Sequence, residues 1–259
     1  MEFIDTHAHL DFKYEENETV KDIIDRALKN KVTKIITISS SPDSIENTFK
    51  LSQEFDNIYH SVGVHPHEAK VFSRDIENLM FKLNSKKCVA VGEIGLDYHY
   101  NLSPTDIQKK TFLRMTEIAR ELKLPIIIHT READNDTYEI LKSEYKDTCS
   151  GVLHCYSGTK EQLKKYLDLG LHVSFTGIIT FPKADTVKEV VAYAPKDRIM
   201  IETDCPFLAP VPHRGKKNYP EYIPIIAAKV SEIKNITVEE VARHTTENAL
   251  NLFTKINNG

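Results

Sequence analysis

A chain of 259 residues, 41% hydrophobic and 28% charged, has enough apolar material for one large core. No apolar run approaches the roughly 18 residues of a membrane-spanning helix, and no signal peptide is recognisable at the start, so we expect a cytoplasmic protein. The net charge of −4 gives no general attraction for a polyanion, so nucleic acid would have to be held by a local basic patch and metal ions.

The predicted elements alternate between strands and helices along the chain. Eight short apolar runs predict strands at residues 3–4, 34–38, 58–64, 88–91, 126–128, 152–153, 172–175 and 199–201. No linker, low-complexity tract or block of like charge marks a domain boundary between them. Eight strand–helix units of about 32 residues suit the roughly 250 residues of a (β/α)8 barrel. We therefore expect an α/β fold, a TIM-type (β/α)8 barrel in a single domain over residues 1–259, with a doubly wound open sheet as the competing fold.

Two helix starts are marked by capping signals. Ser103 is expected to cap a helix that has Pro104 at its first position. Thr237 and Glu240 form a capping box in front of a helical stretch at 241–252. The second helix would close the outer ring, because no further strand follows it.

Side chains that can bind a metal lie within or after most of the apolar runs. They are His7, His9, His65, His67, Glu93, His129, His154, Glu202 and Asp204. Residues i and i+2 of a strand point to the same side, so each close pair can aim two groups into one cavity. The carboxyl ends of barrel strands meet at one face, where these groups would converge. A lone histidine is more often packed or solvated, but six convergent strand ends favour a divalent metal site.

Several stretches resemble, in order, the signatures of the TatD family of metal-dependent deoxyribonucleases. They are FIDTHAHLDF, VGVHPH, VGEIGLDYHY, PIIIHTREA, GVLHCYSG, IETDCPFLAP and RGKKNYP, and TTENALNLF resembles the family's close. The resemblance implies a TIM-type barrel of the amidohydrolase-like group, two adjacent divalent metals and DNase activity, often 3′ to 5′ on single strands. It therefore implies DNA as the substrate partner, and no membrane or obligate protein partner is evident.

The resemblance also implies roles for individual residues. His7 and His9 would hold one metal with Asp204, His129 and His154 would hold the other, and Glu93 would bridge both. His65 and Glu202 match positions near the site that orient ligands or substrate. Magnesium is implied by the resemblance, whereas four imidazoles favour manganese or zinc.

Basic and aromatic residues on the presumed loops are candidates for substrate binding. Arg214 and Lys216 follow the last strand, where barrels often build phosphate sites, and Arg131 is a further candidate. A solvated charged loop is the competing interpretation for these residues. Tyr98 and Tyr100 could stack on unpaired bases, although packing against the barrel is the more common use of such rings.

The implied reaction is hydrolysis of a phosphodiester by water activated between two metals, with Asp204 accepting the proton and Glu93 bridging. One alternative is a small-molecule amidohydrolase of the same barrel group. Many of those enzymes bridge their metals with a modified lysine after the fourth strand, and Glu93 in that place favours the nuclease. A D-aminoacyl-tRNA deacylase would use the same metals on an ester. A non-catalytic binding barrel is the remaining alternative.

Overall fold

The strands form one parallel sheet that follows chain order. The structure is a computed structural model that describes residues 1–73, 80–144 and 150–258. Its strands are β1 (Phe3–Ala8), β2 (Val32–Thr37), β3 (Ile58–Val62), β4 (Cys88–Asp97), β5 (Ile126–Arg131), β6 (Gly151–Leu153), β7 (His172–Phe175) and β8 (Ile199–Ile201). Every neighbouring pair from β1–β2 to β7–β8 is parallel.

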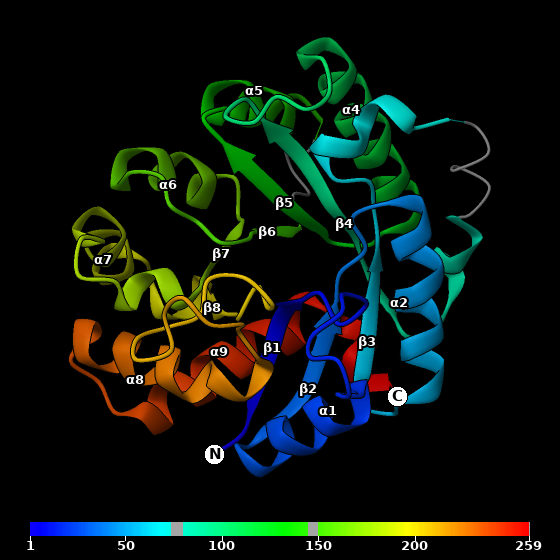
Figure 1. Cartoon of the computed structure of the whole chain (residues 1–259). Helices are drawn as coiled ribbons and strands as arrows, with labels where there is room; N and C mark the ends of the chain where they lie inside the picture. Colours follow the sequence, from blue (N-terminus) through cyan, green and yellow to red (C-terminus); the bar gives the residue numbers. More distant parts are fainter. Residues whose placement is uncertain (74–79, 145–149, 259) are drawn as a thin grey trace.

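The sheet closes into a barrel between its first and last strands (Figure 1). The Thr6 hydroxyl donates to the Ile201 carbonyl at 3.1 Å, and the Asp204 amide donates to the His7 carbonyl at 2.9 Å. A bridge between Ala8 and Cys205 continues this pairing beyond β8. The predicted TIM-type barrel is thereby confirmed, and the open doubly wound sheet is excluded.

Helices surround the barrel on its outside, as Figure 1 shows. They are α1 (Val20–Lys29), α2 (Pro42–Glu54), α4 (Thr105–Leu122), α5 (Asp134–Glu144), α6 (Lys160–Asp168), α7 (Asp185–Tyr193), α8 (Ile223–Lys234) and α9 (Val238–Leu252). β1, β4 and β7 are buried along their whole length, as expected of strands in a parallel sheet covered by helices. None of the helices described is long and apolar enough to cross a membrane.

The two predicted helix starts have different outcomes. The capping box of Thr237 and Glu240 is confirmed, although α9 begins at Val238 rather than at residue 241. The prediction for Ser103 is wrong, because Pro104 is the residue before α4 and no side chain caps that helix. The Ser103 hydroxyl instead donates to the His67 carbonyl at 2.8 Å and accepts from the Lys70 amide at 3.1 Å.

One end of the barrel is filled by apolar side chains. Ile4, Val89 and Met200 belong to a buried cluster that also contains Phe253 and Ile256, which follow α9. The Tyr59 hydroxyl donates to the Ile256 carbonyl at 3.2 Å and ties this segment to β3. The candidate ligands lie instead in or beyond the carboxyl-terminal halves of the strands.

Candidate metal centre

A cavity of about 760 Å³ opens where the strands end. Its lining includes residues from β4 and β5 and from segments that follow β1, β3, β6 and β8. Among them are His9, His65, Glu93, His129, His154 and Asp204. The convergence predicted for the strand ends is therefore present in the folded chain.

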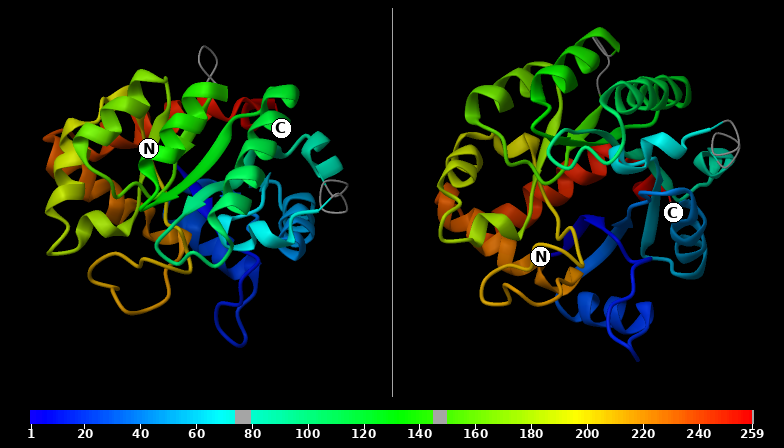
Figure 2. Two further views of the ribbon diagram at one scale, coloured as in Figure 1. Left: turned by 90° about the horizontal axis from the view of Figure 1, so that it is seen from above. Right: turned by 45° about the horizontal axis from the view of Figure 1, so that its top comes forward.

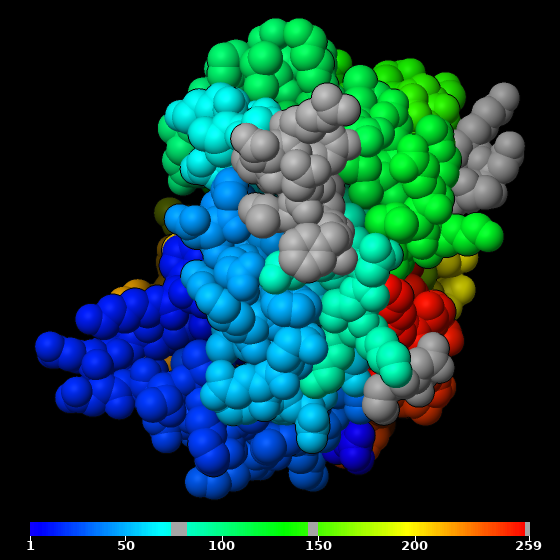
Figure 3. Space-filling model, turned by 90° about the vertical axis from the view of Figure 1, so that its right-hand side faces the viewer, coloured from blue at the N-terminus to red at the C-terminus, as the bar shows by residue number. Residues whose placement is uncertain are grey.

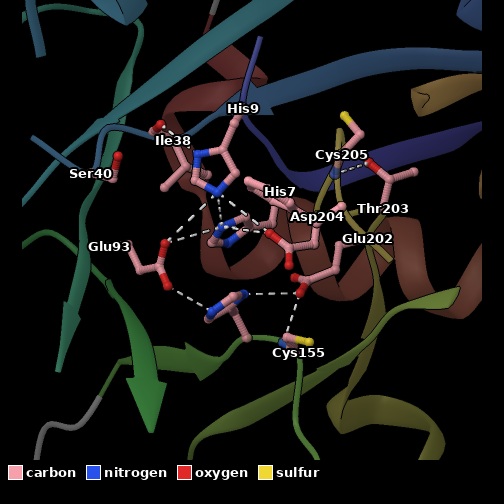
Figure 4. Close-up of polar contacts among 12 residues, drawn as sticks. His7, His9, Ile38, Ser40, Glu93, Cys155, Glu202, Thr203, Asp204 and Cys205 are labelled. Atoms are coloured by element: carbon pink, nitrogen blue, oxygen red, sulfur yellow. Dashed lines mark hydrogen bonds and ion pairs between the residues drawn. The ribbon is translucent and has the colours of Figure 1, made fainter. Parts of the chain in front are cut away.

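Three of the candidate ligands form what we call the first cluster: His7, His9 and Asp204. The two Nε2 atoms lie 3.3 Å apart, and Asp204 Oδ1 lies 3.7 Å from His7 Nε2 and 3.4 Å from His9 Nε2. Glu93 Oε2 approaches the same nitrogens at 3.4 and 4.0 Å. Two imidazoles and two carboxylates thus face one point, as Figure 4 shows.

A second cluster, His129 and His154, lies on the other side of Glu93. His129 Nδ1 and His154 Nε2 are 3.3 Å apart and lie 3.0 and 2.8 Å from Glu93 Oε1. His65 Nε2 also approaches this oxygen, at 3.5 Å. Each oxygen of the Glu93 carboxylate therefore faces a different cluster.

The outer nitrogens of three histidines contact hydrogen-bond acceptors. His9 Nδ1 lies 3.3 Å from the Ile38 carbonyl, His129 Nε2 lies 3.0 Å from Asp97 Oδ2, and His154 Nδ1 lies 3.2 Å from Glu202 Oε1. A carbonyl or a carboxylate only accepts, so each outer nitrogen carries a proton. The opposite nitrogen then presents its lone pair to the cluster, as metal-binding histidines do.

His65 has the opposite arrangement. Its Nδ1 accepts a hydrogen bond from the His67 amide at 3.1 Å. In the neutral ring the proton is therefore on Nε2, which faces Glu93 Oε1. His65 is thus arranged to donate to Glu93, whereas His9, His129 and His154 are arranged to bind a cation.

The donor set fits divalent cations. Tetrahedral coordination with metal–ligand distances near 2.1 Å separates neighbouring ligand atoms by about 3.4 Å. Most separations in the first cluster are close to this value, and the 3.3 Å between the histidines of the second cluster is as well. Imidazole nitrogens combined with carboxylate oxygens suit zinc, manganese or iron better than an all-oxygen site would.

The charges of the site keep its carboxylates ionised. Burial by itself would raise the pKa of Glu93, but His154, His65 and His129 hold that pKa well below its ordinary range. Burial likewise opposes the ionised form of Asp204, whose pKa is nonetheless lowered by His9 and His7. Both carboxylates are therefore anionic near neutral pH and attract cations.

Close approaches of the backbone place Glu93 between the clusters. A Cβ on Gly95, which has φ of +142°, would lie 1.9 Å from the His129 carbonyl oxygen. A Cβ on Gly63 would lie 2.3 Å from the carbonyl carbon of Gly92. Glycine at these positions lets β4 approach β5 and the segment after β3, so that Glu93 can reach both clusters.

The remaining candidates take different positions. Glu202 is 1% exposed and accepts from the Cys155 amide at 2.7 Å while contacting His154, so it is placed to orient that ligand rather than to contact substrate. Arg131 lines the cavity and lies over the Tyr100 ring. Arg214 and Lys216 are exposed and are absent from the lining. Arg214 lies over the Phe181 ring instead, so a phosphate role for this pair stays a prediction.

Sequence reasoning missed two buried aspartates. Asp97 accepts from His129 and His67, both at 3.0 Å, and its pKa is lowered by these contacts and the Tyr100 amide despite burial. Asp5 accepts from the Thr203 amide at 3.0 Å and from its hydroxyl, and burial raises the Asp5 pKa to about 8. Two-residue alternation from Glu93 would have selected Asp97, which is four positions later on the same face of β4.

Comparisons with known proteins identify the family to which the chain belongs. The family model of TatD related DNase matches residues 4–254. The uncharacterized metal-dependent hydrolase YabD of Bacillus subtilis (strain 168) is 41% identical over 250 residues, which cover 96% of this chain and 98% of the relative. The 3′-5′ ssDNA/RNA exonuclease TatD of Rahnella sp. (strain Y9602) is 33% identical over 225 residues, covering 85% and 86%.

Solved structures show the same fold. The crystal structure of YJJV, a TatD homolog from Escherichia coli k12, has a TM-score of 0.90 and 28% sequence identity, with coverage of 97% of this chain and 98% of the other. The matched range of the family model includes every residue of both clusters and Glu93. The chain therefore belongs to the TatD family, as a metal-dependent hydrolase with relatives that are named as nucleases.

Proposed function

We propose that this chain hydrolyses phosphodiester bonds of DNA and shortens single strands from the 3′ end, using two divalent cations. The observation that carries the proposal is the position of Glu93, whose two oxygens face the two clusters. A carboxylate shared in this way suits a pair of adjacent cations rather than one. The relative named as a 3′-5′ ssDNA/RNA exonuclease supports the substrate class and the direction.

His7, His9 and Asp204 would hold one cation, His129 and His154 the other, and Glu93 would contact both. When bound, the cations supply positive charge that lowers the pKa of water and polarises the phosphoryl oxygens. Magnesium is the first candidate because the sequence resembles magnesium-assayed nucleases, while the four imidazoles favour manganese or zinc.

Asp204 is the proposed proton acceptor of the reaction. It lines the cavity, and its contacts with His7 and His9 keep the carboxylate ionised despite burial. An ionised carboxylate in reach of the cavity can take the proton of an attacking water. Glu93 has both oxygens engaged by histidines and is better suited to hold position than to move a proton.

Positive and polar groups beside the cavity would position the phosphate backbone. Arg131 and His65 both line the cavity. We include Arg214 and Lys216 as contacts for phosphates further along the DNA strand, because the segment that carries them also contains Asp204 and both side chains are exposed.

The test is a nuclease assay on metal-stripped protein. A 5′-labelled single-stranded oligonucleotide is incubated with Mg²⁺, Mn²⁺ or Zn²⁺, beside a Glu93→Gln variant purified identically. We expect a metal-dependent ladder that shortens from the 3′ end, with at least a 100-fold lower rate for the variant. Thermal unfolding of the variant checks that it is folded.

Other outcomes identify the alternatives. An oligonucleotide that stays intact with every metal would overturn the proposal, and activity on D-aminoacyl-tRNA or on small amides would then be measured with the same preparations. Cleavage by Glu93→Gln at the wild-type rate would remove the shared carboxylate from the mechanism. Metal content by mass spectrometry addresses the non-catalytic alternative, which requires near-zero uptake.

A further inference from the structure

Two exposed phenylalanines lie at the cavity on loops from opposite ends of the chain. Phe12 follows β1 and is 42% exposed, and Phe207 follows β8 and is 48% exposed. Both line the cavity, and their ring centroids are 5.6 Å apart in an edge-to-face arrangement. Figure 2 shows that the dark blue loop after β1 and the yellow-orange loop after β8 project from the same end of the barrel.

The pair also contacts a candidate metal ligand. The His9 ring lies 5.5 Å from the Phe12 ring and 6.1 Å from the Phe207 ring, both edge-to-face. Since His9 Nε2 belongs to the first cluster, the aromatic pair packs directly against a member of that cluster. Nearly half of each phenylalanine nevertheless remains open to solvent, so packing inside the protein does not account for the pair.

Exposed cations lie on the same two loops as the pair, and the loop of Phe12 also carries the exposed carboxylates of Glu15 and Glu16. Lys13 follows Phe12, and Arg214 and Lys216 lie on the loop that carries Phe207; all three are exposed. Within the part of the chain that the structure describes, none of the three makes an ion pair with a carboxylate. Figure 3, which is coloured by residue number, shows the N-terminal part in dark blue projecting beyond the surrounding surface. Apolar rings with unpaired cations suit a polyanion that carries flat apolar groups.

We propose that Phe12 and Phe207 bind the nucleobase of the nucleotide whose phosphate enters the first cluster. The inference rests on the proposed function and deepens it by assigning a base subsite. Aromatic rings accept any base, because every base has a π-face, so this subsite confers little sequence preference. A base that reaches rings beside His9 has left a duplex, so the subsite also selects single strands.

The test compares an ordinary oligonucleotide with one whose 3′-terminal nucleotide lacks its base. The variants are Phe12→Ala and Phe207→Ala. Tyr193→Ala is the matched control, because Tyr193 is 42% exposed at the end of α7, just before the chain enters β8 from the far end of the barrel. We expect wild type and control to have about tenfold or greater loss of kcat/KM when the base is absent. On the ordinary strand, each phenylalanine variant should have its kcat/KM lowered by a similar factor. Removing the base from the strand should change the kcat/KM of these variants little.

A binding experiment separates this inference from the proposed function. A strand with 2-aminopurine at its 3′ end is titrated with metal-free protein, and quenching of the fluorophore reports stacking. Quenching by wild type that is absent in the Phe12→Ala/Phe207→Ala double variant supports the base subsite even if no strand is cleaved. The contrary result is that both phenylalanine variants cleave DNA in the presence of metal and lose as much kcat/KM as wild type when the base is absent. That result overturns the base subsite and leaves the proposed nuclease function standing.

Two further outcomes also overturn the base subsite. One is a double variant that quenches the fluorophore as wild type does but has a different oligomeric state by size-exclusion chromatography. This result would show that the phenylalanine pair contacts another protein chain. The other is the absence of both cleavage and quenching in wild type, which would overturn subsite and nuclease together. Equal thermal unfolding of all variants excludes misfolding as the cause of any loss.

Discussion

At the scale of single residues, the orientation of each histidine depends on the acceptor behind it. The Ile38 carbonyl, Asp97 and Glu202 contact the outer nitrogens of His9, His129 and His154. These acceptors fix both the tautomer and the direction of each ring. Asp97 is shared between His129 and His67, so its loss affects two rings at once.

Asp97→Asn is expected to weaken divalent metal binding by about 10- to 100-fold, because the amide can no longer hold His129 as a carboxylate does. Isothermal titration of metal-stripped protein with Mn²⁺ or Zn²⁺ measures the affinity without relying on activity. The matched control is Asp136→Asn, which loses a carboxylate that contacts Tyr98 and Lys109 on the outside of the barrel.

Wild-type affinity in Asp97→Asn would show that the aspartate does not position His129. Equal weakening in Asp136→Asn would point to a general effect of net charge instead. Retained thermal stability in both variants is required for either conclusion.

At the scale of elements, β4 is the strand that organises the site. It spans Cys88–Asp97 and carries both Glu93 and Asp97, so the predicted run at 88–91 is too short. Its contacts with β5 include pairing of Gly95 with His129. The absence of a side chain at Gly95 allows this approach, and the pairing brings Glu93 to the second cluster.

Gly95→Ala is expected to lower the free energy of unfolding by about 3 kcal/mol or more, because the new Cβ would collide with the His129 carbonyl oxygen. Metal affinity should fall as well, since His129 would be displaced. The control is Gly215→Ala, where φ is +85° but no atom lies within 4 Å of the new Cβ. That substitution carries only the backbone strain, about 1 to 2 kcal/mol.

Urea unfolding of both variants measures the difference. Similar losses of unfolding free energy for Gly95→Ala and Gly215→Ala would show that backbone strain alone causes the destabilisation. The close approach of β4 and β5 would then make no contribution.

At the scale of the whole molecule, the barrel separates stability from chemistry. The ligands lie at the carboxyl ends of the strands, while Phe253 and Ile256 pack with strand residues in a separate apolar cluster. Two buried histidines, His60 and His172, belong to strands but not to the cavity lining. They contribute to the pH dependence of folding without belonging to the site. The single domain over residues 1–259 and the cytoplasmic location stay predictions.

Acid is expected to destabilise the fold through these two histidines. Burial lowers the pKa of His60 and of His172 to about 4, below the ordinary value of 6.5 that an unfolded chain retains. Between these values the unfolded state binds more protons, so stability is lost as the pH falls from 6.5 towards 4. Each histidine should contribute about 1 to 2 kcal/mol to the loss between pH 7 and pH 5.

Urea unfolding of metal-stripped protein at several pH values measures this loss. His60→Gln and His172→Gln should each flatten the pH dependence relative to wild type, whatever their effect at pH 7. Parallel pH dependences for wild type and the double variant would contradict the assignment.

The fold was predictable because local patterns carry it. Short apolar runs and helix caps are local patterns, and eight strand–helix units have few compact arrangements. The boundaries were less predictable: α4 follows Pro104 without a side-chain cap, because Ser103 bonds to His67 and Lys70 instead. Such a choice depends on a segment more than thirty residues away.

The sequence by itself determined the barrel, the family and the residue types at the strand ends, because these follow from periodicity and from motifs read in order. Only the tertiary structure decided that the oxygens of Glu93 face different clusters, that Asp97 contacts His129, and that Phe12 lies against Phe207. Each of these depends on side chains from separate strands or loops. Their approach is set by how the sheet closes and how the loops cross its end, which no local pattern encodes.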